Sequence, residues 1–95
     1  MPEWFASGTR RDICVLLYGD ELKKQALKTA LQRRYDRRLR PQQFDGAVRA
    51  LVESGHVERE RDGIADVLTL TDRGERGVES QYEWFRERVA SADDD

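Results

Sequence analysis

The segment RPQQFDGAVRALVESGHV, residues 40–57, constrains the fold most, because it has the pattern of a short helix that ends abruptly before a strand. Pro41 fits the first helical turn, where its missing N–H is not needed, and Gly55 fits the left-handed position that ends a helix. Between them, apolar residues fall at i, i+4, i+7 and i+8: Phe44, Val48, Leu51 and Val52. This period predicts an amphipathic helix whose opposite face is small or polar.

The flanking sequence extends this helix into a small domain. Asp62-Gly63, between strand-like runs at 57–61 and 64–70, is a strong signal for a two-residue hairpin loop. Two helices are expected before residue 40, the second of them capped by Asp20, and a last helix begins at Thr71 or Asp72. The predicted fold is mainly α with a small β-hairpin, in the order α-α-α-β-β-α.

The length of 95 residues allows one modest core, and a chain of this size often gains burial by dimerising. We expect an N-terminal arm at 1–8, one domain at 9–90 and a disordered acidic tail at 91–95. No apolar run approaches the roughly 20 residues that span a bilayer, and no secretory signal is visible. A single cysteine, Cys14, suits a reducing compartment, so the expected location is cytoplasmic.

The sequence gives no sign of catalysis or of a metal centre. One His and one Cys are too few for the usual structural zinc sites. No nucleophile elbow, P-loop, dinucleotide fingerprint or catalytic carboxylate pair is present, so neither an enzyme nor a cofactor is predicted. Cys14 is expected to be inert core, and His56 an edge-of-core residue.

Positive charge is concentrated in one segment, although the net charge of the chain is −2. Residues 21–40 carry eight Lys and Arg against two acidic residues, a net charge of +6. Such a basic stripe on an acidic background indicates a nucleic-acid footprint, and a solvated helix face is the alternative. Fourteen Arg against three Lys, with an acidic second half, are typical of a salt-adapted archaeal proteome.

Residues 40–57 and 67–76 resemble the winged helix-turn-helix transcriptional regulators, and most closely their PadR-type branch. The matching residues are Pro41, Ala47, Val48, Arg49, Leu51, Gly55, Val57, Leu70, Thr71 and Gly74. Asp45 departs from the Tyr usual in that branch, and Gly46 from a frequent Pro. The basic segment before Pro41 is also similar to the winged-helix domain of archaeal replication initiators. Both resemblances imply a fold that binds double-stranded DNA.

The resemblance places helix 41–54 in the major groove, as helix-turn-helix proteins do. Gln42 and Gln43 then lie near adenine edges, and Arg49 near guanine or phosphate. The expected phosphate contacts are Arg33, Arg34, Arg37, Arg38 and Arg40. Arg59 and Arg61 alternate on one face of the hairpin, within reach of phosphate or the minor groove. The predicted function is sequence-specific binding of double-stranded DNA by a transcriptional regulator.

A homodimer is expected through the last helix, 72–90, because the adjacent Trp84 and Phe85 cannot both face one core. The apolar run at 13–17 also calls for a second face to cover it. The expected interface consists of Ile13, Leu17, Tyr82, Trp84, Phe85 and Val89. The alternative function is a winged helix that docks its basic helix on an acidic protein. No membrane partner is predicted, and the sequence leaves open whether a small-molecule effector acts on the protein.

Overall fold

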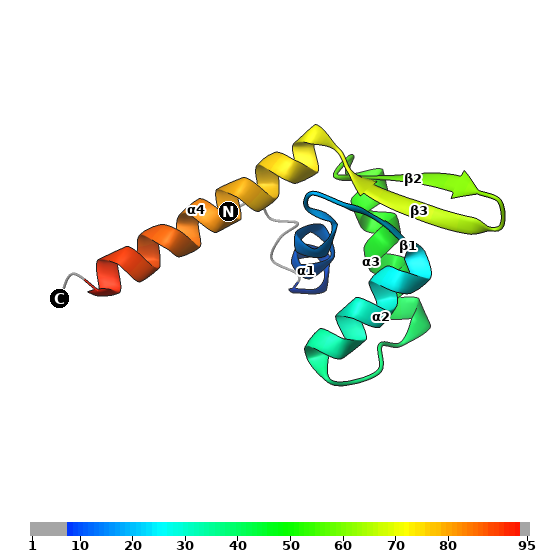
Figure 1. Cartoon of the computed structure of the whole chain (residues 1–95), viewed down its shortest axis with the longest axis horizontal. Helices are drawn as coiled ribbons and strands as arrows, with labels where there is room; N and C mark the ends of the chain where they lie inside the picture. The colour runs from blue at the N-terminus through cyan, green and yellow to red at the C-terminus, as the bar shows by residue number, and fades with distance from the viewer. Residues whose placement is uncertain (1–7, 94–95) are drawn as a thin grey trace.

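The computed structural model describes residues 8–93, whose elements follow the predicted order with one added strand (Figure 1). The helices are α1 (Gly8–Leu17), α2 (Lys24–Tyr35), α3 (Pro41–Glu53) and α4 (Asp72–Asp93). The strands are β1 (Glu21–Lys23), β2 (Val57–Asp62) and β3 (Ala65–Leu70). Because α4 and the β2–β3 hairpin extend in opposite directions from the other helices, the molecule measures 53 × 30 × 22 Å. Apart from Gly8, the arm expected at 1–8 lies outside the described residues.

The added strand, β1, corrects the expectation that Asp20 caps the second helix. Asp20 Oδ1 accepts the backbone N–H of Glu21 at 2.8 Å, and residues 21–23 pair antiparallel with β3, with Leu22 opposite Leu68. The sheet order is therefore β1-β3-β2. A strand of three residues is too short to show an alternating pattern in sequence, yet it gives β3 a second row of backbone hydrogen bonds.

The predicted boundaries of α3 are confirmed. Pro41 occupies its first turn, and Gly55 adopts a φ of +79° directly after it. The N–H of Gly55 donates to the carbonyl of Val52 at 3.1 Å, and the N–H of His56 to that of Leu51 at 3.0 Å. This pair of bonds is the Schellman arrangement, which satisfies carbonyls at a helix end and requires the left-handed residue between.

The loop of the hairpin lies one residue later than predicted. Asp62 still pairs with Ala65 across the strands, so the two loop residues are Gly63 and Ile64. Of these two only Gly63 has a positive φ, of +65°. A glycine at the first loop position is what a type II′ turn needs, whereas the predicted Asp-Gly loop required positive φ at both positions.

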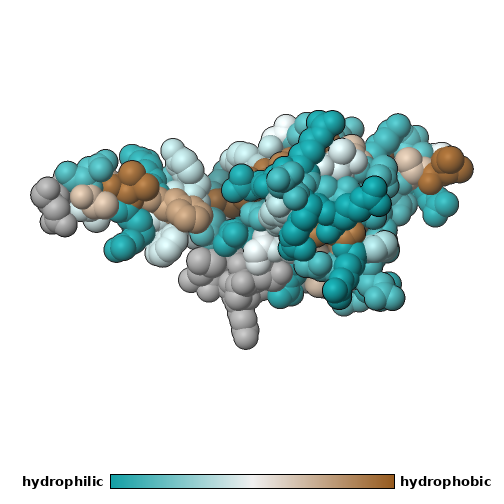
Figure 2. Space-filling view, turned by 90° about the horizontal axis from the view of Figure 1, so that it is seen from below, coloured by the Kyte–Doolittle hydropathy of each residue, from teal (hydrophilic) through white to brown (hydrophobic). Residues whose placement is uncertain are grey.

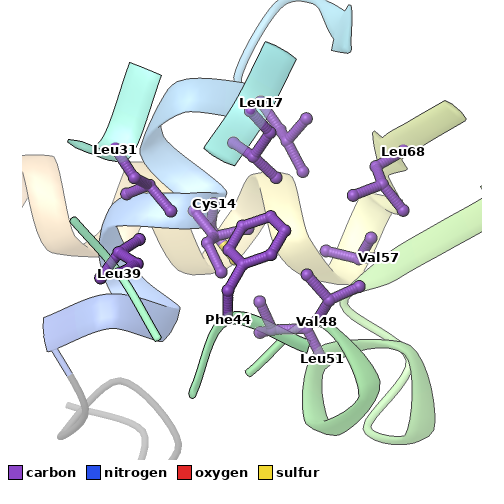
Figure 3. Packing of buried hydrophobic residues seen from close by; sticks show 11 residues of the cluster. Cys14, Leu17, Leu31, Leu39, Phe44, Val48, Leu51, Val57 and Leu68 are labelled. Carbon is purple, nitrogen blue, oxygen red and sulfur yellow. The ribbon is translucent and has the colours of Figure 1, made fainter. Parts of the chain in front are cut away.

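The core lies where α1, α2 and α3 meet the base of the sheet, with the Phe44 ring near its centre (Figure 3). The buried apolar residues are Ile13, Cys14, Leu17, Leu27, Leu31, Leu39, Phe44, Val48, Leu51, Val57 and Leu68. Val52 packs against them and is half-buried. Burial raises the pKa of the Cys14 thiol to about 12, which keeps the thiol protonated, as expected of an inert core cysteine.

Two residues expected at a dimer interface belong to this core instead. Ile13 and Leu17 are fully buried within the subunit. The reason is that α1 packs against α2, α3, α4 and β3. These elements of the same chain bury the apolar side chains of residues 13–17 for which a partner subunit was expected. The exposed large apolar side chains in this region are Val15 of α1 and Tyr18, which directly follows the helix.

The start of α4 is tied to the end of α3. Thr71 caps α4 by accepting the N–H of Gly74 at 3.2 Å, and its hydroxyl donates to the carbonyl of Gly55 at 2.6 Å. Arg73 donates to the carbonyl of Ser54 at 3.1 Å. A Cβ on Gly74 would lie 2.2 Å from the carbonyl oxygen of His56, so only glycine fits there. We call these residues the α3–α4 junction.

The end of α4 corrects the expected tail at 91–95. The helix continues to Asp93, so residues 91–93 form its last turn. No Gly or Pro follows Gly77, and nothing in the sequence therefore interrupts the helix before its acidic end.

Candidate nucleic-acid interface

The outer face of α3 is exposed along its whole length. Gln42, Gly46 and Arg49 follow one another at helical spacing on the side opposite the buried residues of the helix. Apart from Gly46, its chain neighbours and the adjoining backbone of α3, no atom lies within 4 Å of the position that a Cβ on Gly46 would take. The helix is therefore narrow at this point, and its backbone is accessible to a ligand approaching from outside.

The two flanks of α3 differ. On one side Gln43 lines a shallow groove of about 250 Å³ beside Thr9 and Arg10 of α1. On the other side Asp45 pairs with Lys24, with 2.8 Å between Nζ and Oδ1. The carboxylate that departs from the PadR-type pattern is thus neutralised by the start of α2, which reduces its repulsion of a polyanion.

A lysine-lined groove, which the sequence pattern did not assign to the site, borders α3. It measures about 360 Å³, and three lysines line it together with two acidic residues and with residues of α3 and the hairpin: Lys23, Lys24, Lys28, Asp45, Asp66, Pro41 and Ile64. The high positive charge of residues 21–40 was the available signal. The sequence pattern led instead to the arginines at the end of α2, because it did not show that the added strand β1 places Lys23, Lys24 and Lys28 beside α3.

The predicted phosphate-binding arginines are all exposed but do not form one cluster. Arg40 directly precedes α3, whereas Arg33 lies in the last turn of α2 and Arg37 and Arg38 follow that helix (Figure 1). The guanidinium of Arg37 lies 5.6 Å from the centre of the Tyr35 ring. Arg34 lines a groove between α1 and α4, on a different side of the molecule.

The hairpin separates its charges by face. Arg59 lies opposite Leu68 and Arg61 opposite Asp66, so both arginines share the face whose base is buried against the helices. Glu58 and Glu60 project from the other face. All four side chains are exposed. The predicted alternation therefore places both arginines on the helix side of the hairpin, where Asp66 lies beside Arg61 and the net charge of the three side chains is positive.

His56 is a structural residue of the α3–α4 junction. It is 1% exposed, deeper than the edge position expected, and its Nδ1 lies 2.6 Å from Ser54 Oγ. Burial lowers the pKa of the imidazole, and the nearby charge of Arg73 lowers it further. The ring is therefore held neutral at pH 7, as a packed histidine should be.

A second exposed surface runs along α4. Tyr82, Trp84, Phe85 and Val89, all predicted at a dimer interface, are 48–61% exposed. Brown apolar side chains follow α4 on the left of Figure 2, and a separate apolar patch marks the hairpin tip on the right. The Trp84 and Phe85 rings meet edge to face, with 5.3 Å between centroids. We call the residues at heptad spacing, Val78, Tyr82, Phe85 and Val89, the α4 stripe.

Residues 8–93 show neither a metal-ligand cluster nor a membrane segment. No three His, Cys, Asp or Glu side chains among them are grouped as metal ligands. None of the described helices has the length and apolar character needed to cross a membrane.

No protein-family model matches the sequence, and no curated protein matches it. Solved structures are similar in fold. RosR of H. salinarum superposes with a TM-score of 0.80 and 25% identity, over 93% of this chain and 92% of RosR. F93 from STIV, a winged-helix DNA-binding protein, gives a TM-score of 0.70 and 20% identity, over 94% and 96% of the two chains.

A third similar structure is a possible transcriptional regulator for arsenical resistance, with a TM-score of 0.65 and 21% identity, over 95% of this chain and 92% of that one. The predicted winged helix fold is confirmed by these similarities. The PadR-type branch stays a prediction, as do the homodimer and the archaeal source.

Proposed function

We propose that this protein is a transcriptional regulator that binds double-stranded DNA sequence-specifically as a homodimer, with α3 in the major groove. The observation that carries the proposal is the outer face of α3, which is exposed, polar and narrow at Gly46. The lysine-lined groove and the arginine edge of the hairpin border it. Similarity to F93, a DNA-binding protein, and to a possible transcriptional regulator supports the same function.

In this proposal Gln42 and Arg49 contact the edges of the bases. The Gln42 amide offers a donor and an acceptor to adenine, and the Arg49 guanidinium offers paired donors to guanine. Seven residues separate them, roughly 10 Å along the helix axis, a distance of about three base pairs. Gln43 lies on the flank toward α1, so it contacts a neighbouring base or the backbone.

Cationic side chains on both sides of α3 contact the phosphates. Lys23 and Lys28 lie at the groove beside the start of the helix, and Arg40 precedes its first turn. Arg59 and Arg61 contact phosphates of the DNA strand that passes beneath the hairpin. The cations near the end of α2 form an outlying set of proposed phosphate contacts: Arg33, Arg37 and Arg38. Arg34 lines the groove between α1 and α4 and is not among them. Such contacts set register and affinity without reading sequence.

The homodimer accounts for the α4 stripe. Its exposed apolar side chains are covered when a second copy packs on them, and two copies present two α3 helices to adjacent turns of the duplex. Helix-turn-helix dimers read half-sites about 34–36 Å apart, so the expected operator is a pseudo-palindrome. Trp84 lies off the stripe and contributes at its edge through the Phe85 ring.

The proposal is tested by measuring duplex binding over a salt series, first with random DNA and then with a site selected from a random library. Changing Lys23 and Lys28 to Ala should weaken binding to both duplexes alike and lower the log–log salt slope by about 0.9 for each phosphate that is no longer neutralised. Gln42→Ala should cost about 1–3 kcal/mol on the selected site and little on random DNA.

The matched control is Arg86→Ala, which removes an exposed cation on α4, where Arg86 faces Glu83 at 3.7 Å. It should leave both affinities unchanged. If wild-type protein binds no duplex even at low salt, DNA binding is rejected in favour of docking on an acidic protein. If Gln42→Ala weakens both duplexes equally, α3 binds DNA without reading it.

A further inference from the structure

A groove between α1 and α4 contains a buried group that DNA binding does not use. The groove measures about 540 Å³, and Val15 and Leu16 face Val78 and Phe85 across it. Gln81 also lines the groove, together with the charged residues Arg11, Asp12 and Arg34, and is only 5% exposed. Within the described part of the chain, neither its Nε2 nor its Oε1 has a hydrogen-bond partner.

A buried amide without partners destabilises a protein, because it has lost its bonds to water and gained none in return. Gln81 leaves both a donor and an acceptor unused, so whatever satisfies it must offer one of each. The last torsion of a glutamine side chain is broad. Rotation about this torsion therefore re-aims the amide N–H and carbonyl without any movement of α4.

The apolar surface around Gln81 extends further than a small molecule in the groove would cover. The groove ends at Phe85, but Val89 is also exposed, eight residues and roughly 12 Å beyond Gln81 along the axis. The α4 stripe has successive spacings of four, three and four residues, as in a helix that packs lengthwise on another helix. The occupant that fits is therefore a helix.

We propose that α4 of a second copy lies along this groove, with Gln81 of each copy at the twofold axis, where the two amides hydrogen-bond to each other. The inference rests on the homodimer of the proposed function. A glutamine amide is complementary to itself, because the N–H of one donates to the carbonyl of the other in both directions. Val78 and Phe85, three residues before and four after, then flank the pair from opposite copies.

This arrangement makes Gln81 the residue that sets the register of the dimer. An apolar stripe alone allows neighbouring registers of similar stability, whereas a buried polar pair is satisfied in only one of them. The same register fixes the separation of the two α3 helices. Gln81 therefore links the dimer to the half-site spacing without touching DNA.

The test uses Q81E and Q81K chains, one of them carrying a short mass tag, refolded alone and together without DNA. Each alone places like charges at the axis, so each should be mainly monomeric where wild type is dimeric. Native mass spectrometry of the equimolar mixture should show mixed dimers well above the random proportion. The matched control is S80E with S80K, on the exposed side of α4, which should pair at random.

A neutral variant keeps the test decisive if the charged chains do not fold. Q81L keeps the size and removes the amide, and a mixed wild-type and Q81L dimer leaves one amide unpaired. The two chains should therefore sort into like pairs. Random pairing in both experiments overturns the Gln81 pair while leaving a dimer and its DNA binding intact. A monomeric wild type, or one that holds a small molecule in the groove, overturns the docking itself.

Discussion

The surface around α3 and the surface along α4 are both exposed, but their chemistry is opposite. The first presents amides and cations, such as Gln42 and Arg59, and an ion pair between Lys24 and Asp45. The second presents aromatic and aliphatic side chains, such as Phe85 and Val89. Water satisfies polar groups until a polar partner such as the proposed DNA replaces it, whereas exposed apolar area costs free energy until it is covered. The difference predicts a reversible partner for α3 and a lasting one for α4.

The two surfaces are not independent, because the α3–α4 junction ties the end of α3 to the start of α4. Thr71 and Arg73 bond to the carbonyls that follow α3, and Gly74 lets the backbones approach closely. A dimer formed through α4 therefore fixes the direction in which each α3 points. Because the surfaces differ, a variant can be chosen to alter the α3 surface, the α4 surface or the α3–α4 junction alone.

The largest effect is expected from Leu51→Asp, which should remove both surfaces together. Leu51 is fully buried on the inner face of α3. The substitution removes about 1.5–3 kcal/mol of stabilisation from apolar burial, and it also places a carboxylate in the core. A domain of about 5–15 kcal/mol stability should then show no cooperative thermal transition by circular dichroism. Glu53→Gln, on the exposed side of the same helix, is the control. A folded Leu51→Asp dimer that merely lost DNA binding would show that the surfaces fold separately.

The next largest effect is expected at the junction. Gly74→Ala places a Cβ against the His56 carbonyl, and the forced backbone shift should cost about 1–3 kcal/mol of stability in urea unfolding. The control is Gly46→Ala in α3, where the Cβ meets nothing and alanine should stabilise the helix by about 0.5–1 kcal/mol. Equal effects from the two substitutions would mean that the junction is not tightly packed.

Gly55 and Gly74 show what the sequence could and could not reveal. The ends of α3 and its buried face were predictable, because Pro41, Gly55 and the spacing of Phe44, Val48 and Leu51 act locally. The match at Gly74 was visible as part of a motif, but its reason was not. The reason is a contact with His56, which only the folded chain brings within reach.

The errors have the same origin. Strand β1 exists because β3 pairs with it, and no local signal marks three residues as a strand. Ile13 and Leu17 were assigned to a partner because the sequence does not show that four elements of the same chain surround α1. Lys23 and Lys28 were overlooked because their distance from α3 depends on that strand. Composition located the basic segment, and tertiary packing decided which of its cations border the site.

A moderate effect, confined to one surface, is expected from the hairpin. Changing Arg59 and Arg61 together to Ala should weaken binding to all duplexes and lower the salt slope by about 0.9 for each phosphate that the hairpin no longer neutralises. Glu58 and Glu60 changed together to Gln provide the control on the opposite face, and should leave the slope unaltered. Sedimentation should give the same mass for both variants. A change in mass would mean that the two surfaces are coupled through the hairpin.

The smallest effect is expected from pH at the junction. Burial and then Arg73 lower the pKa of His56 in the folded protein, so the unfolded chain takes up a proton first as the pH falls. The stability that neutral His56 contributes is therefore complete above the unfolded pKa of about 6.5 and declines as the pH falls below it toward the lowered folded value. Urea unfolding of wild type and His56→Gln at about pH 7.5 and about pH 5.5, on either side of that unfolded pKa, isolates this contribution, because every other titrating group is common to both. The midpoint of wild type should fall more than that of the variant. An equal fall in both proteins would mean that His56 gains a proton as easily in the junction as in the unfolded chain.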